Sequence, residues 1–389
     1  MNHIPFHDDP PPATAASGDR SFAQETGDSL QNHAASRLRD VHRAVSELKR
    51  GTPIVMTGER DLVLLPAETA GARGLAALSA AAVGPAVLVL AASRAAAVLH
   101  RKGDVSPAVA IRLSEALFDP AALHSLADPT AEQLLPELPV VEAPPPNAMA
   151  ALALAKLARL LPAMIVADTA ALPPDDMLRV AAQDVLDYPL AMATRLVRVA
   201  EAHVPLEDAP EARVVAFRAP DAGIEHLAIL IGQPETQDAP LARVHSECFT
   251  GDLLGSLRCD CGPQLRSAIR KMAEEGAGVL LYLAQEGRGI GLVNKLRAYA
   301  LQDRGMDTLD ANVALGWGAD ERNFLVAATM LDQLGIDRVR LLTNNPDKVA
   351  ALVACGVDVV GRETHVIAPN GVNDGYLGTK QRRFGHLLG

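Results

Sequence analysis

The chain is poor in aromatic residues, which make up only 3% of its 389 residues, so its core must be built mainly from alanine, leucine and valine. No apolar run reaches the ~20 residues that a membrane-spanning helix requires. The segment 75–99 comes nearest, but Gly84, Pro85 and Arg94 interrupt it. The N-terminus carries acids and prolines where a signal peptide needs a basic and then an apolar segment. We therefore expect a cytoplasmic protein that does not bind membranes.

The chain also lacks an excess of basic residues, because its formal net charge is −11. From Leu241 onward it contains 17 basic and 17 acidic residues, so the whole negative charge belongs to the preceding part. A nucleic-acid-binding domain would show a basic stripe. Basic residues here occur instead in short motifs, within the part of the chain whose positive and negative charges balance. This pattern argues against binding of nucleic acid and favours a local anion site.

Cysteine is scarce, and three of the four cysteines fall within fourteen positions as Cys248, Cys259 and Cys261, spaced C-x10-C-x-C. An odd cluster is not a disulfide framework. Thiolate is a good zinc ligand, and three protein ligands leave the fourth tetrahedral position open for water. Arg258 next to the cluster favours thiolate over thiol. The pattern predicts a catalytic zinc site. Packed thiols, or a closed structural site completed by a residue such as His245, are the alternatives.

Composition and periodicity divide the chain into three parts. Residues 1–38 lack periodic apolar residues and are expected to be a disordered tail. Residues 39–195 and 196–389 each alternate strand patterns with helix patterns, which is typical of α/β domains. The sequence therefore predicts two domains of mixed α/β (α+β) class, the second with a mixed sheet and flanking helices.

Several individual elements can be predicted as well. Helices are expected near 34–49, near 177–185 and from about Leu292, and strands at PIVMT and LVLLPA. The proline-rich segment 136–148 cannot continue a helix and is either a linker or a loop within one domain.

Five motifs follow one another in the second half of the chain: RVHSECFTGD, SLRCDCGPQL, QEGRGIGLVNKLRAYALQD, GADERNF and LLTNNPDKV, with YLGTKQRRFGHLL closing the series. In this order they resemble GTP cyclohydrolase II, over roughly Ala242 to Leu388. Ordered blocks are far more specific than one short pattern. The resemblance implies a homodimeric hydrolase that acts on cyclic amidine C–N bonds. From GTP and water it would form formate, pyrophosphate and 2,5-diamino-6-hydroxy-4-(5-phosphoribosylamino)pyrimidine, the first step of riboflavin biosynthesis.

The resemblance also implies a role for individual residues. Cys248, Cys259 and Cys261 would bind Zn²⁺, while Mg²⁺ would accompany the triphosphate. Tyr299 would lie beside the metal, Asp320 would be the general base, and Arg322 would attack the α-phosphate. The positions implied to contact GTP are Arg243, Val244, His245, Ser246, Glu247, Gln264, Glu286, Gly287, Arg288, Thr308, Thr343 and Lys348.

The chemistry of these side chains supports some of the roles more than others. A tyrosine can take part in proton transfer, although without the resemblance Tyr299 would read as a core aromatic. Arginine is effectively always protonated, so Arg322 is better suited to stabilising charge on the α-phosphate than to attacking it. Glycines around Arg288 let the backbone approach a ligand closely, and the helix expected from Leu292 would offer its N-terminus to an anion.

Other polar residues have ordinary interpretations. Asp320 lies near an expected helix start and is able to cap it. Lys348 reads equally well as a solvated surface lysine. His365 and His386 have no carboxylate or cysteine pattern around them, and Cys355 at a helix end is expected to be structural.

The first domain begins with RAVSELKRGTPIVMTGERDLVLLPAE, which loosely resembles the opening of a dihydroxybutanone-phosphate synthase. The acidic run that the magnesium site of that family requires is missing, since only Glu59, Arg60 and Asp61 stand there. We expect a degenerate, inactive domain that serves as a scaffold or dimer surface, with an unrelated α/β domain as the alternative.

Two further functions stay open for the whole chain. One is a paralogue that acts on another nucleotide or in pyrimidine catabolism. The other is a non-catalytic regulator that binds zinc and a nucleotide.

Overall fold

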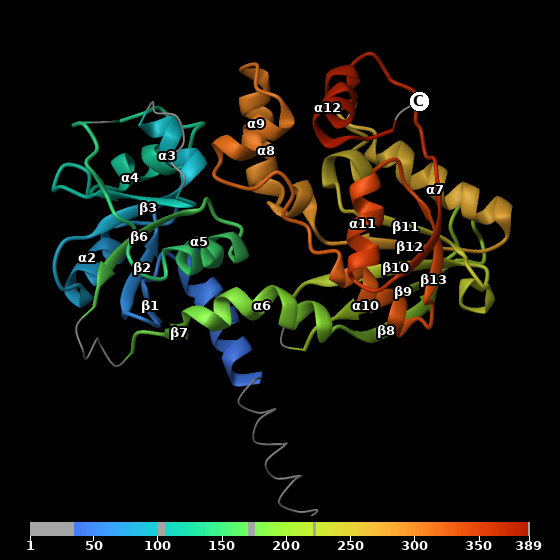
Figure 1. The fold of residues 1–389 in the computed structure, drawn as a ribbon, viewed down its shortest axis with the longest axis horizontal. Helices are drawn as coiled ribbons and strands as arrows, with labels where there is room; N and C mark the ends of the chain where they lie inside the picture. The colour runs from blue at the N-terminus through green and yellow to red at the C-terminus, as the bar shows by residue number, and fades with distance from the viewer. Residues whose placement is uncertain (1–34, 100–105, 135, 170–175, 221–222, 388–389) are drawn as a thin grey trace, which may run out of the picture.

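The computed structural model describes residues 35–387 apart from 100–105, 135, 170–175 and 221–222. The predicted disordered tail therefore lies almost entirely outside the described residues. Its last four residues, 35–38, instead belong to a helix over 35–49. The strands form two seven-stranded sheets, and helices lie against both of them (Figure 1). This confirms the predicted mixed α/β class.

The first sheet is almost entirely antiparallel, in the order β5-β4-β3-β6-β2-β1-β7, and only the β1–β7 pair is parallel. Along β2, Leu62 and Leu64 pack into one core cluster and Val63 and Leu65 into the other, because successive side chains of a strand point to opposite faces. The strands are β1 (Ile54–Thr57), β2 (Leu62–Pro66), β3 (Val87–Ala91), β4 (Ala108–Arg112), β5 (Val141–Glu142), β6 (Ala163–Asp168) and β7 (Arg179–Ala181).

Helices cover both faces of the first sheet. One face is covered by α2 (Ala72–Ala81), α3 (Ala92–Val98) and α4 (Pro120–Ala127). The other is covered by the helix over 35–49, by α5 (Ala148–Leu157) and by the beginning of α6 (Ala182–Thr194).

The structure corrects one predicted helix and decides the role of the proline-rich segment. The helix predicted near 177–185 is wrong, because Arg179–Ala181 pairs with β1 and the helix α6 begins only at Ala182. Long-range strand pairing here overrides the local preference. The segment 136–148 is a loop within the first sheet rather than a linker, since β5 within it pairs with β4.

The second sheet has the order β14-β13-β11-β12-β10-β9-β8. Its first four strands run parallel to one another, and the remaining pairs are antiparallel. The strands are β8 (Val197–His203), β9 (Arg213–Arg218), β10 (Glu225–Ile231), β11 (Leu241–Ser246), β12 (Gly278–Leu283), β13 (Arg338–Leu342) and β14 (Asp358–Glu363). In the sheet, β12 lies on one side of β11 and β13 lies on the other. The strand order therefore reverses at β11, which makes it a topological switch point.

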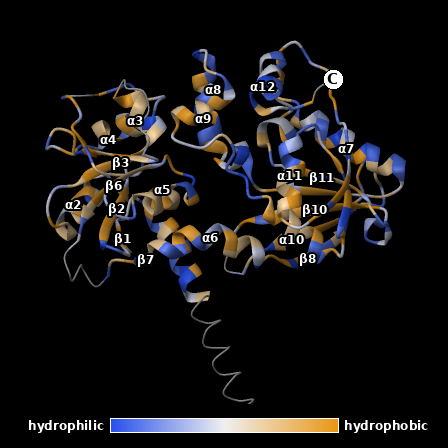
Figure 2. Ribbon diagram, viewed as in Figure 1, coloured by the Kyte–Doolittle hydropathy of each residue, from blue (hydrophilic) through white to orange (hydrophobic). Residues whose placement is uncertain are grey.

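Helices also lie on both faces of the second sheet. Helix α7 (Cys261–Glu275) packs on one face, while α10 (Leu325–Gln333), α11 (Pro346–Ala354) and the end of α6 pack on the other. Buried strands of both sheets are strongly hydrophobic (Figure 2).

Helices α8 (Leu292–Asp303) and α9 (Thr308–Ala314) follow β12 in the chain but pack against the first sheet. Ile290, Leu301 and Trp317 belong to the same buried cluster as Val63 and Leu65. In Figure 1 these two helices stand between the sheets, with α12 (Asp374–Phe384) beyond them. The two predicted domains therefore share this hydrophobic cluster, the shared core.

No helix among the residues described in the structure is both long and apolar enough to cross a membrane.

The buried histidine of β10 makes folding sensitive to acid. His226 is 7% exposed, its Nδ1 accepts a 3.1 Å hydrogen bond from the Ala284 N–H, and burial lowers its pKa from 6.5 to about 4. The unfolded chain therefore binds a proton below about pH 6.5 that the folded chain excludes until about pH 4, so stability falls as the pH falls through this window. Lowering the pH from 7 to 5 should cost about 2 kcal/mol through this residue.

We expect His226→Asn to reduce the loss of stability between pH 7 and pH 5 by that amount, because the amide oxygen of asparagine replaces Nδ1 as acceptor and does not titrate. Urea unfolding followed by circular dichroism at both pH values measures the difference. An unchanged pH dependence in the variant would show that His226 is not the titrating group.

Candidate active site

A cavity opens at the carboxyl ends of β11, β12 and β13, where ligands of open α/β sheets usually bind. Its wall is formed by the ends of these strands and by α7, α8 and the C-terminal segment. The lining residues are Arg243, Val244, His245, Ser246, Glu247, Cys248, Arg258, Cys259, Cys261, Gln264, Glu286, Gly287, Arg288, Lys295, Ala298, Tyr299, Gln302, Thr308, Asn312, Arg322, Asn345, Lys348, Tyr376, Lys380 and His386.

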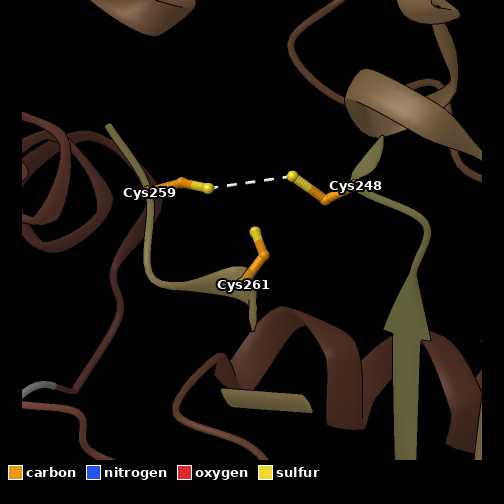
Figure 3. Close-up of side chains that lie close together, drawn as sticks. All are labelled: Cys248, Cys259 and Cys261. Carbon is orange, nitrogen blue, oxygen red and sulfur yellow. Dashed lines mark hydrogen bonds between the residues drawn. The ribbon is translucent and has the colours of Figure 1, made fainter. Parts of the chain in front are cut away.

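Three cysteines line this cavity, and their side chains point toward one another (Figure 3). Cys248 follows β11, whereas Cys259 and Cys261 lie at the start of α7. The sulfur atoms of Cys248 and Cys259 are 3.7 Å apart, and all three sulfurs lie within 4.8 Å of one another. Gly251 permits this approach, because a Cβ there would lie only 2.6 Å from the Cys259 sulfur and 2.9 Å from that of Cys248.

The donor set fits a zinc ion. Tetrahedral coordination with Zn–S bonds of about 2.3 Å places sulfurs about 3.8 Å apart. Among the described residues, no His, Asp or Glu joins the three cysteines in this group. The Nε2 atom of His245 instead lies 3.1 Å from Asp252, so His245 is not a fourth ligand. The arrangement favours an open site over the closed one.

One negative charge is already favoured within the cluster. Hydrogen bonds from the thiols of Cys259 and Cys261, and the ammonium of Lys295, lower the pKa of Cys248 far below its usual range. The hydrogen bond to Cys248 correspondingly raises the pKa of Cys259 to about 11. The surroundings therefore favour a thiolate at Cys248 and argue against a set of apolar packed thiols.

Asp252 holds the loop that carries Cys248. This loop is a short π-helix, η2 (Phe249–Leu253). The Asp252 carboxylate accepts hydrogen bonds from the Cys248 N–H at 3.0 Å and the Tyr282 hydroxyl at 3.0 Å, in addition to its contact with His245. The ring of His245 stacks on Tyr282 at 5.6 Å. These contacts join β11, β12 and the loop that carries Cys248.

Lys295 is a central residue that the sequence analysis did not single out. It is 9% exposed, and its Nζ donates to the Cys248 sulfur at 3.0 Å, to Thr250 Oγ1 at 3.0 Å and to Glu286 Oε1 at 2.8 Å. The sequence did contain a signal, because Lys295 precedes Tyr299 by four residues and so shares its helix face.

Tyr299 lies one turn after Lys295 on α8, and its side chain also reaches Thr250 beside the three cysteines. Its hydroxyl lies 3.4 Å from Thr250 Oγ1, and its ring lies 5.6 Å from the Lys295 Nζ. Burial raises the pKa of Tyr299, so the phenol is protonated at neutral pH and able to donate.

Several cations gather around the cavity. Burial lowers the pKa of Arg243 to about 10. Burial, together with the charges of Arg322 and Arg243, lowers the pKa of Lys348 well below its usual value. Burial and the nearby Lys380 and Lys348 lower the pKa of His386 to about 3. This clustering of positive charge favours a polyanionic ligand.

The structure decides between the interpretations left open for Lys348 and the two histidines. Lys348 is not a solvated surface lysine, because it lines the cavity and its Nζ donates to the Val244 carbonyl at 3.0 Å. His386 also lines the cavity. His365 is buried, and its Nδ1 lies 2.8 Å from Arg243 NH1.

Arg288 occupies a strained position in the turn after β12. Its φ is 62°, in the left-handed region that non-glycine residues rarely adopt. Its guanidinium group lies 3.6 Å from the centre of the Phe384 ring of α12. Such strain clusters at functional sites. The helix expected from Leu292 begins there, after the turn.

Two of the predicted site residues do not line the cavity. Thr343 is 5% exposed, and its Oγ1 accepts the Asn345 N–H at 3.1 Å. Asp320 is bonded to Arg322, whose Nε donates to Oδ1 at 2.8 Å. Asp320 does not cap α10, which begins only at Leu325. The remaining predicted residues are all brought together in the wall.

We expect Gly251→Ala to weaken Zn²⁺ binding by roughly ten- to hundred-fold, a loss typical of disturbed support around metal ligands. The added Cβ would displace the sulfurs of Cys248 and Cys259. Competition with a chelating dye measures the affinity. Gly71→Ala is the control, because a Cβ at Gly71 meets nothing within 4 Å. Equal affinities of variant and control would contradict the assigned geometry.

Comparison with known proteins places the chain in a family. The family model for GTP cyclohydrolase II matches residues 197–364. The GTP cyclohydrolase-2 of Azospirillum brasilense is 47% identical over 377 residues, which cover 90% of this chain and 94% of that protein. The GTP cyclohydrolase-2 of Pasteurella multocida is 51% identical over 195 residues, or 50% of this chain and 89% of that protein.

A solved structure of a two-domain 3,4-dihydroxy-2-butanone 4-phosphate synthase from A. baumannii aligns with 84% of this chain and 99% of that one, at 16% identity and a TM-score of 0.29. The match to the Azospirillum relative runs through both sheets, well beyond the segment that contains the motifs. The chain belongs to the GTP cyclohydrolase II family.

Proposed function

We propose that this protein is a zinc-dependent GTP cyclohydrolase II. It converts GTP and water to formate, pyrophosphate and 2,5-diamino-6-hydroxy-4-(5-phosphoribosylamino)pyrimidine, the first step of riboflavin biosynthesis. The observation that carries the proposal is that one cavity combines a three-sulfur cluster with a cationic wall. Family membership supports GTP as the substrate.

In the proposed reaction, Cys248, Cys259 and Cys261 hold the metal. A zinc ion in this position supplies a Lewis acid and lowers the pKa of water, which suits hydrolysis at purine carbon 8 and of the resulting formyl group. Lys295 donates to the Cys248 sulfur and so balances the charge of the ligand set.

Tyr299 is proposed to steer water and to move a proton near the reacting carbon. The Thr250 hydroxyl and the Lys295 ammonium hold its side chain in place. A protonated phenol close to the three sulfurs is suited to donate to a developing anion.

The cationic wall is proposed to bind the triphosphate. Arg322 lines the cavity, and its planar fork suits phosphate oxygens, so it would stabilise charge as pyrophosphate leaves. Burial by itself would raise the pKa of Asp320. Hydrogen bonds from Arg322 and the charge of Arg322 outweigh this effect, so the pKa is lowered overall. A carboxylate so paired is a weak base, and we therefore assign Asp320 to holding Arg322 rather than to the general-base role that the resemblance implies.

Mg²⁺ is proposed to arrive with the triphosphate rather than to occupy a site of its own. The carboxylates in the described wall are those of Glu247 and Glu286. Glu286 is already bonded to Lys295 and to the Phe249 N–H. The remaining predicted GTP contacts, with Arg243 to Glu247, Gln264, Gly287 and Thr308, are proposed from their place in this wall.

Residues 196–389 are proposed to form the cyclohydrolase domain, and residues 39–195 an inactive domain derived from a dihydroxybutanone-phosphate synthase. One of the two acids near its opening, Asp61, lies 3.8 Å from Arg179. The proposed enzyme is a cytoplasmic homodimer that binds no nucleic acid.

Purified protein is expected to release formate from GTP, with one Zn²⁺ per chain. Cys259→Ser should lose both the metal and turnover, because two sulfurs do not complete the site. Formate release, product mass and metal content are measured together. Turnover of another nucleotide without formate release from GTP would favour the paralogue, and full zinc and activity in Cys259→Ser would overturn the metal assignment.

Tyr299→Phe is expected to lower kcat on the order of 100-fold, which is the contribution of a positioned acid or base, while GTP affinity changes by less than about two-fold. Steady-state kinetics and equilibrium GTP binding separate the two effects. Tyr188→Phe in α6 is the control, as it lies outside the cavity wall. A non-catalytic regulator would instead bind GTP and show no turnover in any form.

A further inference from the structure

We propose that the first domain positions the catalytic residues of the second through two polar clamps, centred on Arg297 and Lys156. This inference rests on the proposed function. All residues in the described wall of the cavity lie at or after Arg243. The first domain therefore acts on the reaction through the position of other residues and not by touching the substrate.

Helix α8 is the link, because its faces have different partners. Lys295, Tyr299 and Gln302 line the cavity. On the other side, Leu301 packs in the shared core with the first sheet, and the Asn294 side-chain amide donates to the Arg159 carbonyl at 3.0 Å. Any displacement of α8 against the first domain moves Lys295 and Tyr299 relative to the three sulfurs.

Arg297 forms the first clamp. Its Nε donates to Asp128 at 2.8 Å, its NH2 to Glu68 at 2.9 Å and its NH1 to Asn294 at 2.8 Å. The side chains of Arg297, Glu68 and Asp128 are only 15%, 13% and 4% exposed. Buried charge pairs of this kind specify one geometry, since leaving a partner unpaired is costly.

The acidic partners of Arg297 are themselves fixed within the first domain. The second oxygen of Glu68 accepts the Leu161 N–H at 2.6 Å. The Asp128 carboxylate accepts the Thr130 N–H at 2.8 Å. Backbone N–H groups of the first domain therefore hold the two carboxylates that bind Arg297, and through Arg297 they fix the position of α8.

Lys156 forms the second clamp, on the loop that carries Arg322. Its Nζ lies 2.5 Å from Glu321 Oε1. The same oxygen accepts the Gly318 N–H at 2.7 Å, and the Glu321 N–H donates to the Arg288 carbonyl at 3.0 Å. Lys156 thus holds a residue adjacent in sequence to Arg322 and hydrogen-bonded to the strained turn of Arg288.

The two clamps bear on different groups of the site. Arg297 affects the position of Lys295 and Tyr299 beside the sulfurs. Lys156 affects the position of Arg288 and Arg322 in the cationic wall that is proposed to bind the triphosphate. If both act by position, loosening either one lowers the rate of the chemical step. Loosening the contacts of Arg297 leaves the cationic wall in place, so the affinity for GTP is preserved.

The test uses full-length variants altered only in the first domain and outside the cavity. Glu68→Gln keeps the shape but removes the charge opposite Arg297, and Lys156→Met removes the second clamp. We expect Glu68→Gln to lower kcat about five-fold with KM for GTP and zinc content unchanged. Lys156→Met should lower kcat and raise KM, each about three-fold, and Lys156→Arg should restore both.

Glu142→Gln is the matched control, because it breaks the exposed Arg112–Glu142 pair within the first domain. Thermal unfolding is measured for each variant. A merely structural role would lower the unfolding temperature and leave kcat and KM of the folded enzyme as in the control. That result would overturn the proposal.

The proposed function and this inference fail in distinguishable ways. If the unaltered protein releases no formate from GTP, the proposed function fails. The coupling is then measured by amide hydrogen exchange. Exchange in α8 should become faster in Glu68→Gln, and exchange in residues 318–322 should become faster in Lys156→Met. Neither should change in Glu142→Gln. Unchanged exchange in both variants would overturn the inference by itself.

Discussion

The contact between the Lys295 ammonium and the Cys248 sulfur, at 3.0 Å, is the interaction on which the rest of the site depends. Three sulfurs held this close need a positive partner, because a thiolate in a buried position is costly without one. Lys295 supplies that charge from α8, and the same helix carries Tyr299. The contact therefore connects the loop after β11 to a helix whose other side belongs to the core of the first domain.

A second constraint is electrostatic. The cavity brings together side chains of Arg243, Arg288, Arg322, Lys348 and Lys380, and burial lowers the pKa of several of them. Mutual repulsion of this kind is relieved by an anion, so the wall is arranged for a ligand with several negative charges. The same cavity also contains the three cysteines, whose sulfurs lie close enough together to hold a metal ion beside this wall.

Much of the site was predictable because its residues stand in contiguous motifs. The spacing of the cysteines, the turn around Arg288 and the stretch from Arg243 to Glu247 each come from one short segment, and the structure brings them into one wall. Residues whose role depends on distant partners were not predictable in this way. His386 and Lys295 were not among the predicted site residues, and Lys348 was equally compatible with a surface position, because the groups they meet lie on other strands and helices. The helix expected near 177–185 was wrong for the same reason, since pairing with β1 determines that segment.

By itself, the sequence determined the mixed α/β class, the family and which three cysteines form a cluster, because periodicity, composition and motif spacing are local properties of the chain. Only the tertiary structure decided how the two halves cooperate. A helix that follows β12 in the chain returns to the first sheet, and there Arg297 meets Glu68 and Asp128. Contacts between residues about 170 to 230 positions apart arise because α8 packs into the core of the first sheet, and no local pattern encodes them.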